Sequence, residues 1–167
     1  MLSGVDTTYP SLGQRVRAAR DRAFVGREEE QALFRAALNN DRSFAILFVH
    51  GPGGIGKSAL LRRFAAEAEA AGRPVVTVDC HTVDPSPSAF EAEAAPALTA
   101  AGAVLLVDTF ERCQGLEGWL REGFLPRVPV GTLVVIAGRN PPDLRWQADP
   151  GWAEVLRVMR LRALAPR

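Results

Sequence analysis

Four short apolar runs divide the chain, and each has the length of a β-strand. They are residues 44–49, 74–78, 104–107 and 133–137. The first, third and fourth are apolar without interruption, as in strands that are covered on both faces of a sheet. The last part of the chain, residues 155–164, can supply the end of a helix and a short fifth strand.

Segments with helical periodicity lie between these runs, because their apolar residues recur at spacings of three and four. They are residues 11–22, 30–38, 60–71 and 116–124. Gly72 is a suitable stop signal for the third. The Ala-rich segment 85–101 is expected to hold one helix that is interrupted near Pro96, and residues 140–143 (Asn-Pro-Pro-Asp) are expected to be a loop. Strands that alternate with helices predict an α/β fold, with a parallel sheet of about five strands and right-handed crossovers.

The overall composition excludes several classes of protein. With 167 residues, of which 47% are hydrophobic and 23% charged, the chain has the composition of one soluble globular domain. Its net charge of +1 gives no reason to expect a nucleic acid or an anionic membrane as a partner. No apolar run reaches the roughly 18 residues that span a bilayer, and the N-terminus does not resemble a signal peptide. We therefore expect a cytoplasmic location.

The two cysteines do not form a metal-binding motif. Cys80 and Cys113 are far apart in the sequence and lack a second Cys or His at ligand spacing, and His81 beside Cys80 is the only near-miss. Two residues make a poor metal site, so we expect both cysteines to be small buried or half-buried side chains in a reducing compartment.

The strongest chemical signal is the segment Gly51-Pro52-Gly53-Gly54-Ile55-Gly56-Lys57-Ser58, which we call the phosphate loop. It satisfies the pattern G-x-x-x-x-G-K-[ST], with an apolar strand before it and an amphipathic helix after it. Glycines let backbone N–H groups curl around phosphate oxygens, and the start of the helix adds positive partial charge. A glycine-rich turn that matches by chance is the alternative, and the flanking pattern argues against it.

We therefore expect this loop, together with Ala59 in the first turn of the helix, to bind a nucleoside triphosphate, most simply ATP. Lys57 is expected to reach the β- and γ-phosphates, and the Ser58 hydroxyl is expected to ligate Mg²⁺. Asp108 follows the third apolar run and faces the same edge of a parallel sheet, so it is expected to hold Mg²⁺ through water. A helix cap is the alternative role for Asp108.

Two more residues are candidates for chemistry on the γ-phosphate. The carboxylate that polarises water in many ATPases directly follows the Walker B acid, but Thr109 has that place here. If a helical turn begins at Asp108, Glu111 lies on the same face and can reach the water; otherwise it is a solvated residue beside Arg112. Arg139 follows the fourth run and either senses the γ-phosphate or is a surface residue of a proline-rich loop. Hydrolysis is therefore expected to be slow or to depend on another group.

Four motifs stand in a characteristic order: residues 24–28 (Phe-Val-Gly-Arg-Glu), the phosphate loop, residues 104–111 and residues 135–139. Together they resemble the nucleotide-binding module of the STAND class of P-loop ATPases, which are signal-transduction ATPases with numerous domains. The resemblance covers the chain from about Phe24 to its end. It implies a three-layer fold of the ASCE type with strand order 5-1-4-3-2, ATP or ADP as the ligand, and a slow switch between a monomer and a signalling oligomer.

The resemblance also assigns roles to residues. Val25, Gly26 and Arg27 would line the adenine and ribose side of the nucleotide. Lys57 and Ser58 would have the Walker A roles, Asp108 the Walker B role and Arg139 the sensor role.

Members of this class continue into a helical lid, a winged helix and sensor repeats, whereas this sequence stops at Arg167. The resemblance therefore predicts an N-terminal helical extension in residues 1–22 and a P-loop domain in residues 23–167. The lid, the further domains and the regulatory partners or self-association that they mediate would belong to a longer protein.

Other functions of a phosphate loop remain as alternatives. A small-molecule or nucleotide kinase usually has an Arg-bearing lid, and residues 91–101 contain no Arg or Lys. A GTPase would need an Asn/Thr-Lys-x-Asp motif, and a transporter ATPase a Ser-Gly-Gly signature; neither is present. A module that binds nucleotide without hydrolysing it stays open because of Thr109.

Overall fold

The computed structural model describes residues 11–23, 27–39 and 44–163. Its centre is one parallel sheet with the strand order β2-β3-β4-β1-β5. Read from the opposite edge, this is the expected order 5-1-4-3-2. The strands are β1 (Ile46–His50), β2 (Val75–Asp79), β3 (Val104–Asp108), β4 (Leu133–Gly138) and β5 (Leu156–Arg160). Because all four pairings are parallel, the carboxyl ends of the strands meet at one edge of the sheet.

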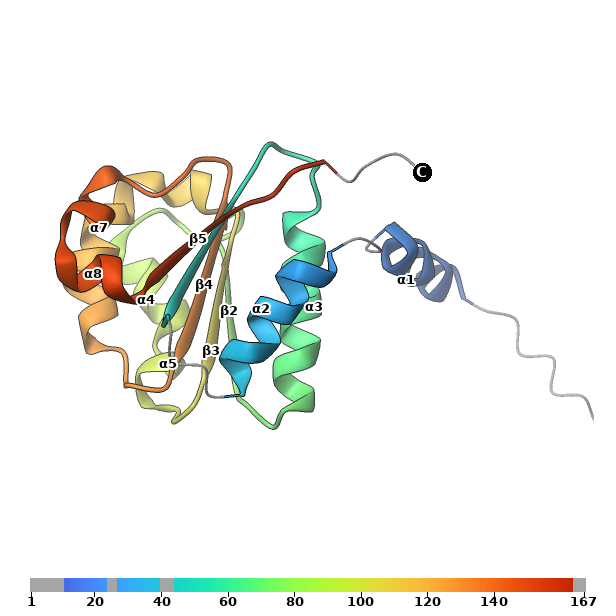
Figure 1. The fold of residues 1–167 in the computed structure, drawn as a ribbon, viewed down its shortest axis with the longest axis horizontal. Helices are drawn as coiled ribbons and strands as arrows, with labels where there is room; N and C mark the ends of the chain where they lie inside the picture. Colours follow the sequence, from blue (N-terminus) through green and yellow to red (C-terminus); the bar gives the residue numbers. More distant parts are fainter. Residues whose placement is uncertain (1–10, 24–26, 40–43, 164–167) are drawn as a thin grey trace, which may run out of the picture.

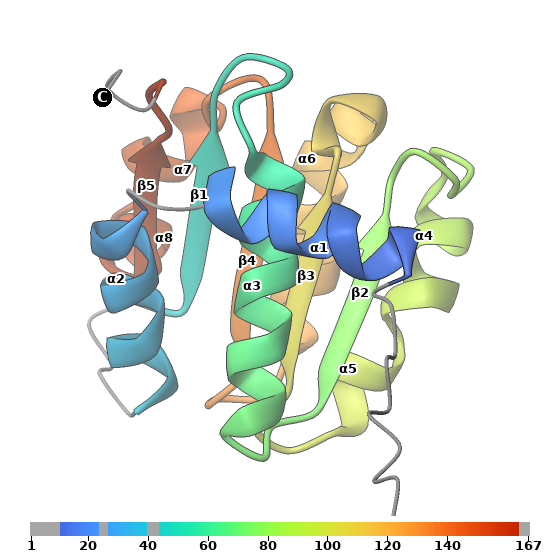
Figure 2. The ribbon, with the colours of Figure 1, turned by 90° about the vertical axis from the view of Figure 1, so that its right-hand side faces the viewer.

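Helices α2 (Glu28–Leu38) and α3 (Lys57–Ala70) cover one face of the sheet, on the right in Figure 1. Their contact centres on Phe34 and Phe64, whose rings stack with centroids 4.0 Å apart and are fully buried. Both rings pack against strand residues such as Leu47. Helix α1 (Leu12–Ala23) lies outside this layer, beyond α3 (Figures 1 and 2).

A series of shorter helices covers the other face. They are α4 (Pro87–Ala94), α5 (Pro96–Thr99), η1 (Phe110–Leu116), α6 (Glu117–Trp119), η2 (Leu120–Phe124), η3 (Leu125–Arg127), α7 (Leu144–Ala148) and α8 (Pro150–Val155). A second core forms here, with Phe90, Phe110, Phe124 and Trp146 among its largest buried side chains. The sheet therefore lies between two separate cores, which confirms the predicted three-layer α/β fold.

Several element boundaries differ from the sequence prediction. Strand β1 begins two residues later than expected, and helix α3 already begins at Lys57, before its first buried leucine. The single helix expected over residues 116–124 is part of a chain of short 3₁₀, α and π segments from Phe110 to Arg127. Glycines within this stretch weaken any continuous helix. The predicted break near Pro96 is confirmed, since α5 begins there.

Helices α7 and α8 were not predicted as separate helices. Each begins at an aspartate whose side chain accepts hydrogen bonds from the next amides, namely Asp143 and Asp149. Both cysteines are buried and free, as expected, and burial together with a hydrogen bond to Cys113 raises the pKa of the Cys80 thiol. Within the part of the chain that the structure describes, no helix has the length and apolar character to cross a membrane.

Candidate functional site

The phosphate loop joins the end of β1 to the start of α3, at the carboxyl edge of the sheet (Figures 1 and 2). Gly54 and Gly56 have φ angles of 79° and 101°, in the left-handed region that favours glycine. The Gly56 carbonyl accepts the Leu60 amide at 3.0 Å, and the Gly51 amide donates to the Gly138 carbonyl on β4 at 3.2 Å. The loop is thus fixed to both the helix and the sheet.

Lys57 lies inside this loop and is only 8% exposed. Its ammonium group donates to the Gly51 carbonyl at 2.5 Å and to the Pro52 carbonyl at 2.8 Å. Burial, helped by the nearby Arg139, lowers the pKa of Lys57, and the carboxylates of Glu111 and Asp108 oppose this shift. Lys57 is therefore close enough to Arg139, Glu111 and Asp108 for their charges to affect it.

Asp108 is the last residue of β3, and its Oδ1 accepts the Thr109 amide at 2.8 Å. Thr109 has φ 57° and ψ 42°, a left-handed conformation that is costly for a β-branched residue. A helical turn from Asp108 was one of two alternatives for this segment, and the structure begins the turn at Phe110 instead, after the left-handed Thr109. This strained residue directly follows Asp108, for which the Walker B role is predicted.

Glu111 nevertheless points toward the loop. Its Oε1 lies 3.5 Å from Nε of Arg139, and its Oε2 is buried without a hydrogen-bond partner. A Cβ atom added to Gly53 would lie 3.2 Å from Nη2 of Arg139, so the guanidinium lies against the phosphate loop. The Glu111 side chain is 19% exposed, so the interpretation as a solvated residue beside Arg112 does not fit the structure.

Arg27 reaches the loop from the start of α2. Its Nη2 donates to the Ile55 carbonyl at 3.0 Å, and its Nη1 lies 3.6 Å from the Glu30 carboxylate. The guanidinium is buried, so this arginine holds the loop rather than extending into solvent. The other two residues expected on the adenine side, Val25 and Gly26, lie outside the described residues.

His50 was not singled out in the sequence, although it is the last residue before the loop. It pairs with Gly138 on β4 and with Arg160 on β5. Burial, Arg160 and Lys57 all lower the pKa of His50. Its place at the end of an apolar strand was the signal that could have identified it.

The oxygen donors near the loop fit Mg²⁺. Among the residues that the structure describes, no group of three or more His, Cys, Asp or Glu side chains could hold a metal ion alone. Mg²⁺ binds to one or two protein oxygens and takes its remaining ligands from phosphates and water. The Ser58 hydroxyl in the first turn of α3 and the Asp108 carboxylate are donors of this kind. They would need a nucleotide to complete the site.

A hollow lies at the other end of the strands and is separate from this site. It has a volume of about 620 Å³ and is lined by mainly apolar residues, including Ile46 and Leu133 at the starts of β1 and β4. Of the polar side chains there, Arg73 is already bonded to the Gly102 and Gly131 carbonyls. Lys57, Asp108 and Arg139 lie at the opposite edge of the sheet.

Residues 23–119 match the family model described as AAA ATPase domain. Among solved structures, the chain is similar to Cdc6p from Pyrobaculum aerophilum, with 16% identity and a TM-score of 0.55 over 82% of this chain and 45% of that one. It is also similar to the replication initiator DnaA bound to AMPPCP and single-stranded DNA, with 18% identity and a TM-score of 0.52 over 83% and 47% of the two chains.

A third similar structure is described as a DNA replication initiation factor, with 18% identity and a TM-score of 0.53 over 82% of this chain and 47% of that one. At these identities the likeness shows the fold alone. The present chain spans less than half the length of each of these structures. No curated protein matches it.

Proposed function

The chain belongs to the AAA ATPase domain family, and from this premise we propose that it binds ATP and ADP with Mg²⁺ at the phosphate loop. We further propose that it is the nucleotide-binding domain of a STAND-type signalling ATPase and acts as a slow nucleotide-dependent switch. In this proposal residues 23–167 are the P-loop domain and residues 1–22 are an N-terminal helical extension.

One observation carries the proposal: the Lys57 ammonium and the Arg139 guanidinium lie on the same glycine loop. The first is bonded to the carbonyls of Gly51 and Pro52, and the second lies against Gly53. Arg139 contributes to the lowered pKa of Lys57, so the two cations repel each other, and the Glu111 and Asp108 carboxylates offset part of this repulsion. A bound polyphosphate would relieve it further. Backbone amides at the start of α3 add further positive partial charge.

Each remaining residue then has a defined role. Lys57 would exchange its carbonyl partners for the β- and γ-phosphates, and Arg139 would contact the γ-phosphate. Ser58 and Asp108 would hold Mg²⁺, which neutralises phosphate charge when bound. Arg27, through its bond to the Ile55 carbonyl, would keep the loop next to the adenine side.

Slow hydrolysis follows from the position of Glu111. A carboxylate that orients water must be free to accept its proton, but Glu111 is paired with Arg139. The residue directly after Asp108 is Thr109, which has no carboxylate. Turnover would therefore require the Glu111–Arg139 pair to rearrange. The resulting slow hydrolysis would give the long-lived ATP-bound state that a switch requires.

The STAND assignment is supported by the order of motifs, in particular by a Gly-Arg-Glu motif before the loop and an arginine directly after β4. ATP and ADP differ at the γ-phosphate, and Arg139 stands where it would detect that difference. The similar DnaA structure contains AMPPCP, which supports a nucleotide as the ligand. It also contains single-stranded DNA, but a net charge of +1 gives no electrostatic support for DNA binding by this chain.

The test is isothermal titration calorimetry of the chain with ATP, ADP and GTP, with and without Mg²⁺, together with phosphate release. ATP and ADP are expected to bind, and the Lys57→Ala variant is expected to lose at least about tenfold in affinity, the equivalent of about 1.4 kcal/mol. Arg62→Ala is the matched control, because Arg62 is an exposed cation on the same helix. Phosphate release should be slow.

Three results would contradict the proposal. The first is folded protein that gives no heat with any nucleotide. The second is a Lys57→Ala variant that binds as well as the Arg62→Ala control. The third is rapid phosphate transfer to an added small-molecule acceptor, which would favour a kinase.

A further inference from the structure

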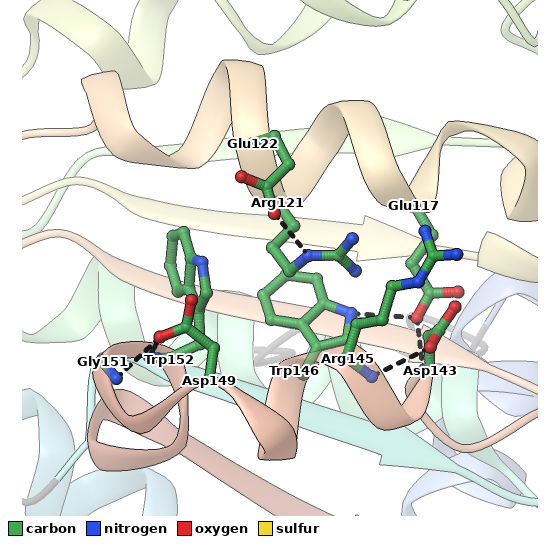
Figure 3. A network of polar contacts seen from close by, with 9 residues as sticks. All are labelled: Glu117, Arg121, Glu122, Asp143, Arg145, Trp146, Asp149, Gly151 and Trp152. Carbon is green, nitrogen blue, oxygen red and sulfur yellow. Dashed lines mark hydrogen bonds and ion pairs between the residues drawn. The ribbon is translucent and has the colours of Figure 1, made fainter.

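The Glu117 carboxylate connects two segments that are far apart in the sequence (Figure 3). It is buried, with 6% exposure, at the first residue of α6. Its Oε1 accepts the Asp143 amide at 2.7 Å and the Trp146 indole N–H at 3.0 Å. Its Oε2 accepts the Gln114 side-chain amide at 2.6 Å. Both oxygens are thus fixed.

Burying a carboxylate costs free energy, so the hydrogen bonds from its three neutral donors must compensate for the water that it loses. Two of these donors, those of Asp143 and Trp146, come from the loop after β4 and from α7. Trp146 itself is fully buried, stacks edge-on with Trp152 at 5.4 Å and lies under the Arg121 guanidinium at 5.6 Å. The far end of the connection is therefore anchored in the core (Figure 3).

The connected segments are the ones that carry the two residues facing the γ-phosphate position. Glu111 and Gln114 both belong to η1, directly before Glu117. Arg139 is four residues before Asp143, and two prolines stiffen the chain between them. Gly138 in β4 fixes the chain on one side of Arg139, and the bond to the Asp143 amide limits the path of the chain on its other side.

Arg139 needs such support, because its side chain is 63% exposed. Little packing holds the guanidinium, so its reach toward the loop depends on where its backbone lies. We propose that Glu117 is a positioning residue that holds Arg139 against the γ-phosphate position and so sets the preference for ATP over ADP. This inference rests on the proposed function.

A purely structural role for Glu117 makes a different prediction. If it only accepts the hydrogen bond of the buried Trp146 indole, its loss should lower stability and leave the ratio of ATP to ADP affinity unchanged. If it positions Arg139, its loss should lower the affinity for ATP and leave the affinity for ADP unchanged, because ADP lacks the phosphate that Arg139 would contact. The ratio of the two affinities separates these roles.

The experiment measures dissociation constants for Mg²⁺-ATP and Mg²⁺-ADP in the full chain. Glu117→Met, which keeps the length but removes both acceptors, is expected to weaken ATP about tenfold, the lower end of what losing a hydrogen bond to a charged group costs. ADP is expected to change less than about twofold. Glu117→Gln retains an acceptor and is expected to stay close to the wild type.

A double-mutant cycle with Arg139→Ala tests whether Glu117 acts through the arginine. Arg139→Ala is expected to reduce the ATP preference by itself, and Glu117→Met is expected to add no further loss in that background. An unchanged ratio in Glu117→Met, an unchanged ratio in Arg139→Ala, or additive effects of the two would each overturn the inference.

A second pair of variants covers the case in which Glu117→Met does not fold. Asp143→Pro removes the bonded amide, and its φ of −54° suits proline, whereas Asp143→Ala removes only the cap of α7. The preference for ATP over ADP is expected to fall in Asp143→Pro and to stay unchanged in Asp143→Ala. The same ratio of ATP to ADP affinity in both variants would overturn the inference. Wild-type protein that binds neither nucleotide would contradict the proposed function itself. Tight nucleotide binding with the same ratio of ATP to ADP affinity in all variants would contradict only the role of Glu117.

Discussion

Arg139 and Glu111 face each other beside the phosphate loop, with Nε of the arginine 3.5 Å from Oε1 of the glutamate. The second oxygen of Glu111 is buried without a hydrogen-bond partner. A buried carboxylate oxygen without a donor is uncommon, and a catalytic role is one of the explanations for such a group. Glu111, which contacts Arg139 and lies beside the phosphate loop, is therefore a candidate for a role in hydrolysis.

The first prediction concerns this carboxylate. Glu111→Gln is expected to slow phosphate release by about 10²-fold or more, the usual contribution of a group that accepts a proton in the transition state. ATP affinity is expected to stay the same or increase, because a negative charge next to the γ-phosphate is removed. Single-turnover phosphate release and calorimetry measure the two effects. Unaltered release would show that Glu111 takes no part in hydrolysis.

The second prediction concerns the metal. Asp108→Asn is expected to reduce the gain in ATP affinity that Mg²⁺ provides, since an amide is a weaker ligand for this ion than a carboxylate. Asp79→Asn is the matched control, because Asp79 ends the neighbouring strand β2 and pairs in register with Asp108. The measurement is a titration of ATP affinity against Mg²⁺. Equal losses in both variants would count against the assignment of Asp108.

The third prediction uses the fact that Lys57 is the single lysine of the sequence. Burial lowers its pKa, so its uncharged and nucleophilic form appears at a lower pH than in an ordinary lysine. Acylation of Lys57 by an amine-directed reagent is expected to rise with pH through a midpoint below 10.5. Peptide mass spectrometry separates this reaction from that of the N-terminal amine. ATP or ADP should protect Lys57, and a midpoint at or above 10.5 would contradict the described burial.

The fourth prediction concerns the conformation of the loop. Gly56→Ala is expected to lower the free energy of unfolding by about 1–2 kcal/mol and to weaken nucleotide binding, because a Cβ atom is strained at φ 101°. Gly115→Ala is the matched control, since a Cβ atom there meets no neighbour within 4 Å. Urea unfolding measures both variants. Similar stabilities of the two would argue against a left-handed Gly56.

The fifth prediction concerns the contact between α2 and α3. Phe64→Ala removes a fully buried ring that stacks on Phe34, and it is expected to lower the free energy of unfolding by about 3–5 kcal/mol. Ala65→Gly, at the next and less buried position of α3, should cost only about 1 kcal/mol. Chemical denaturation checks both values, and a loss below about 1 kcal/mol for Phe64→Ala would show that α2 does not pack as described.

Local patterns in the sequence predict the sheet, the phosphate loop and the strand ends that carry Asp108 and Arg139. Uninterrupted apolar runs and a spaced glycine pattern are local signals, because they depend only on residues that are neighbours in the sequence. The strand order was available only through the family resemblance, because local patterns do not state which strands are neighbours.

The tertiary structure alone decided which charged groups meet. Nothing near Glu117 in the sequence indicates that its carboxylate holds the Asp143 amide and the Trp146 indole, because both lie more than twenty residues away and reach it only after α7 packs. The contact of Arg27 with the Ile55 carbonyl has the same origin. Pairings of this kind depend on distances in the folded core, and the order of residue types along the chain does not predict them.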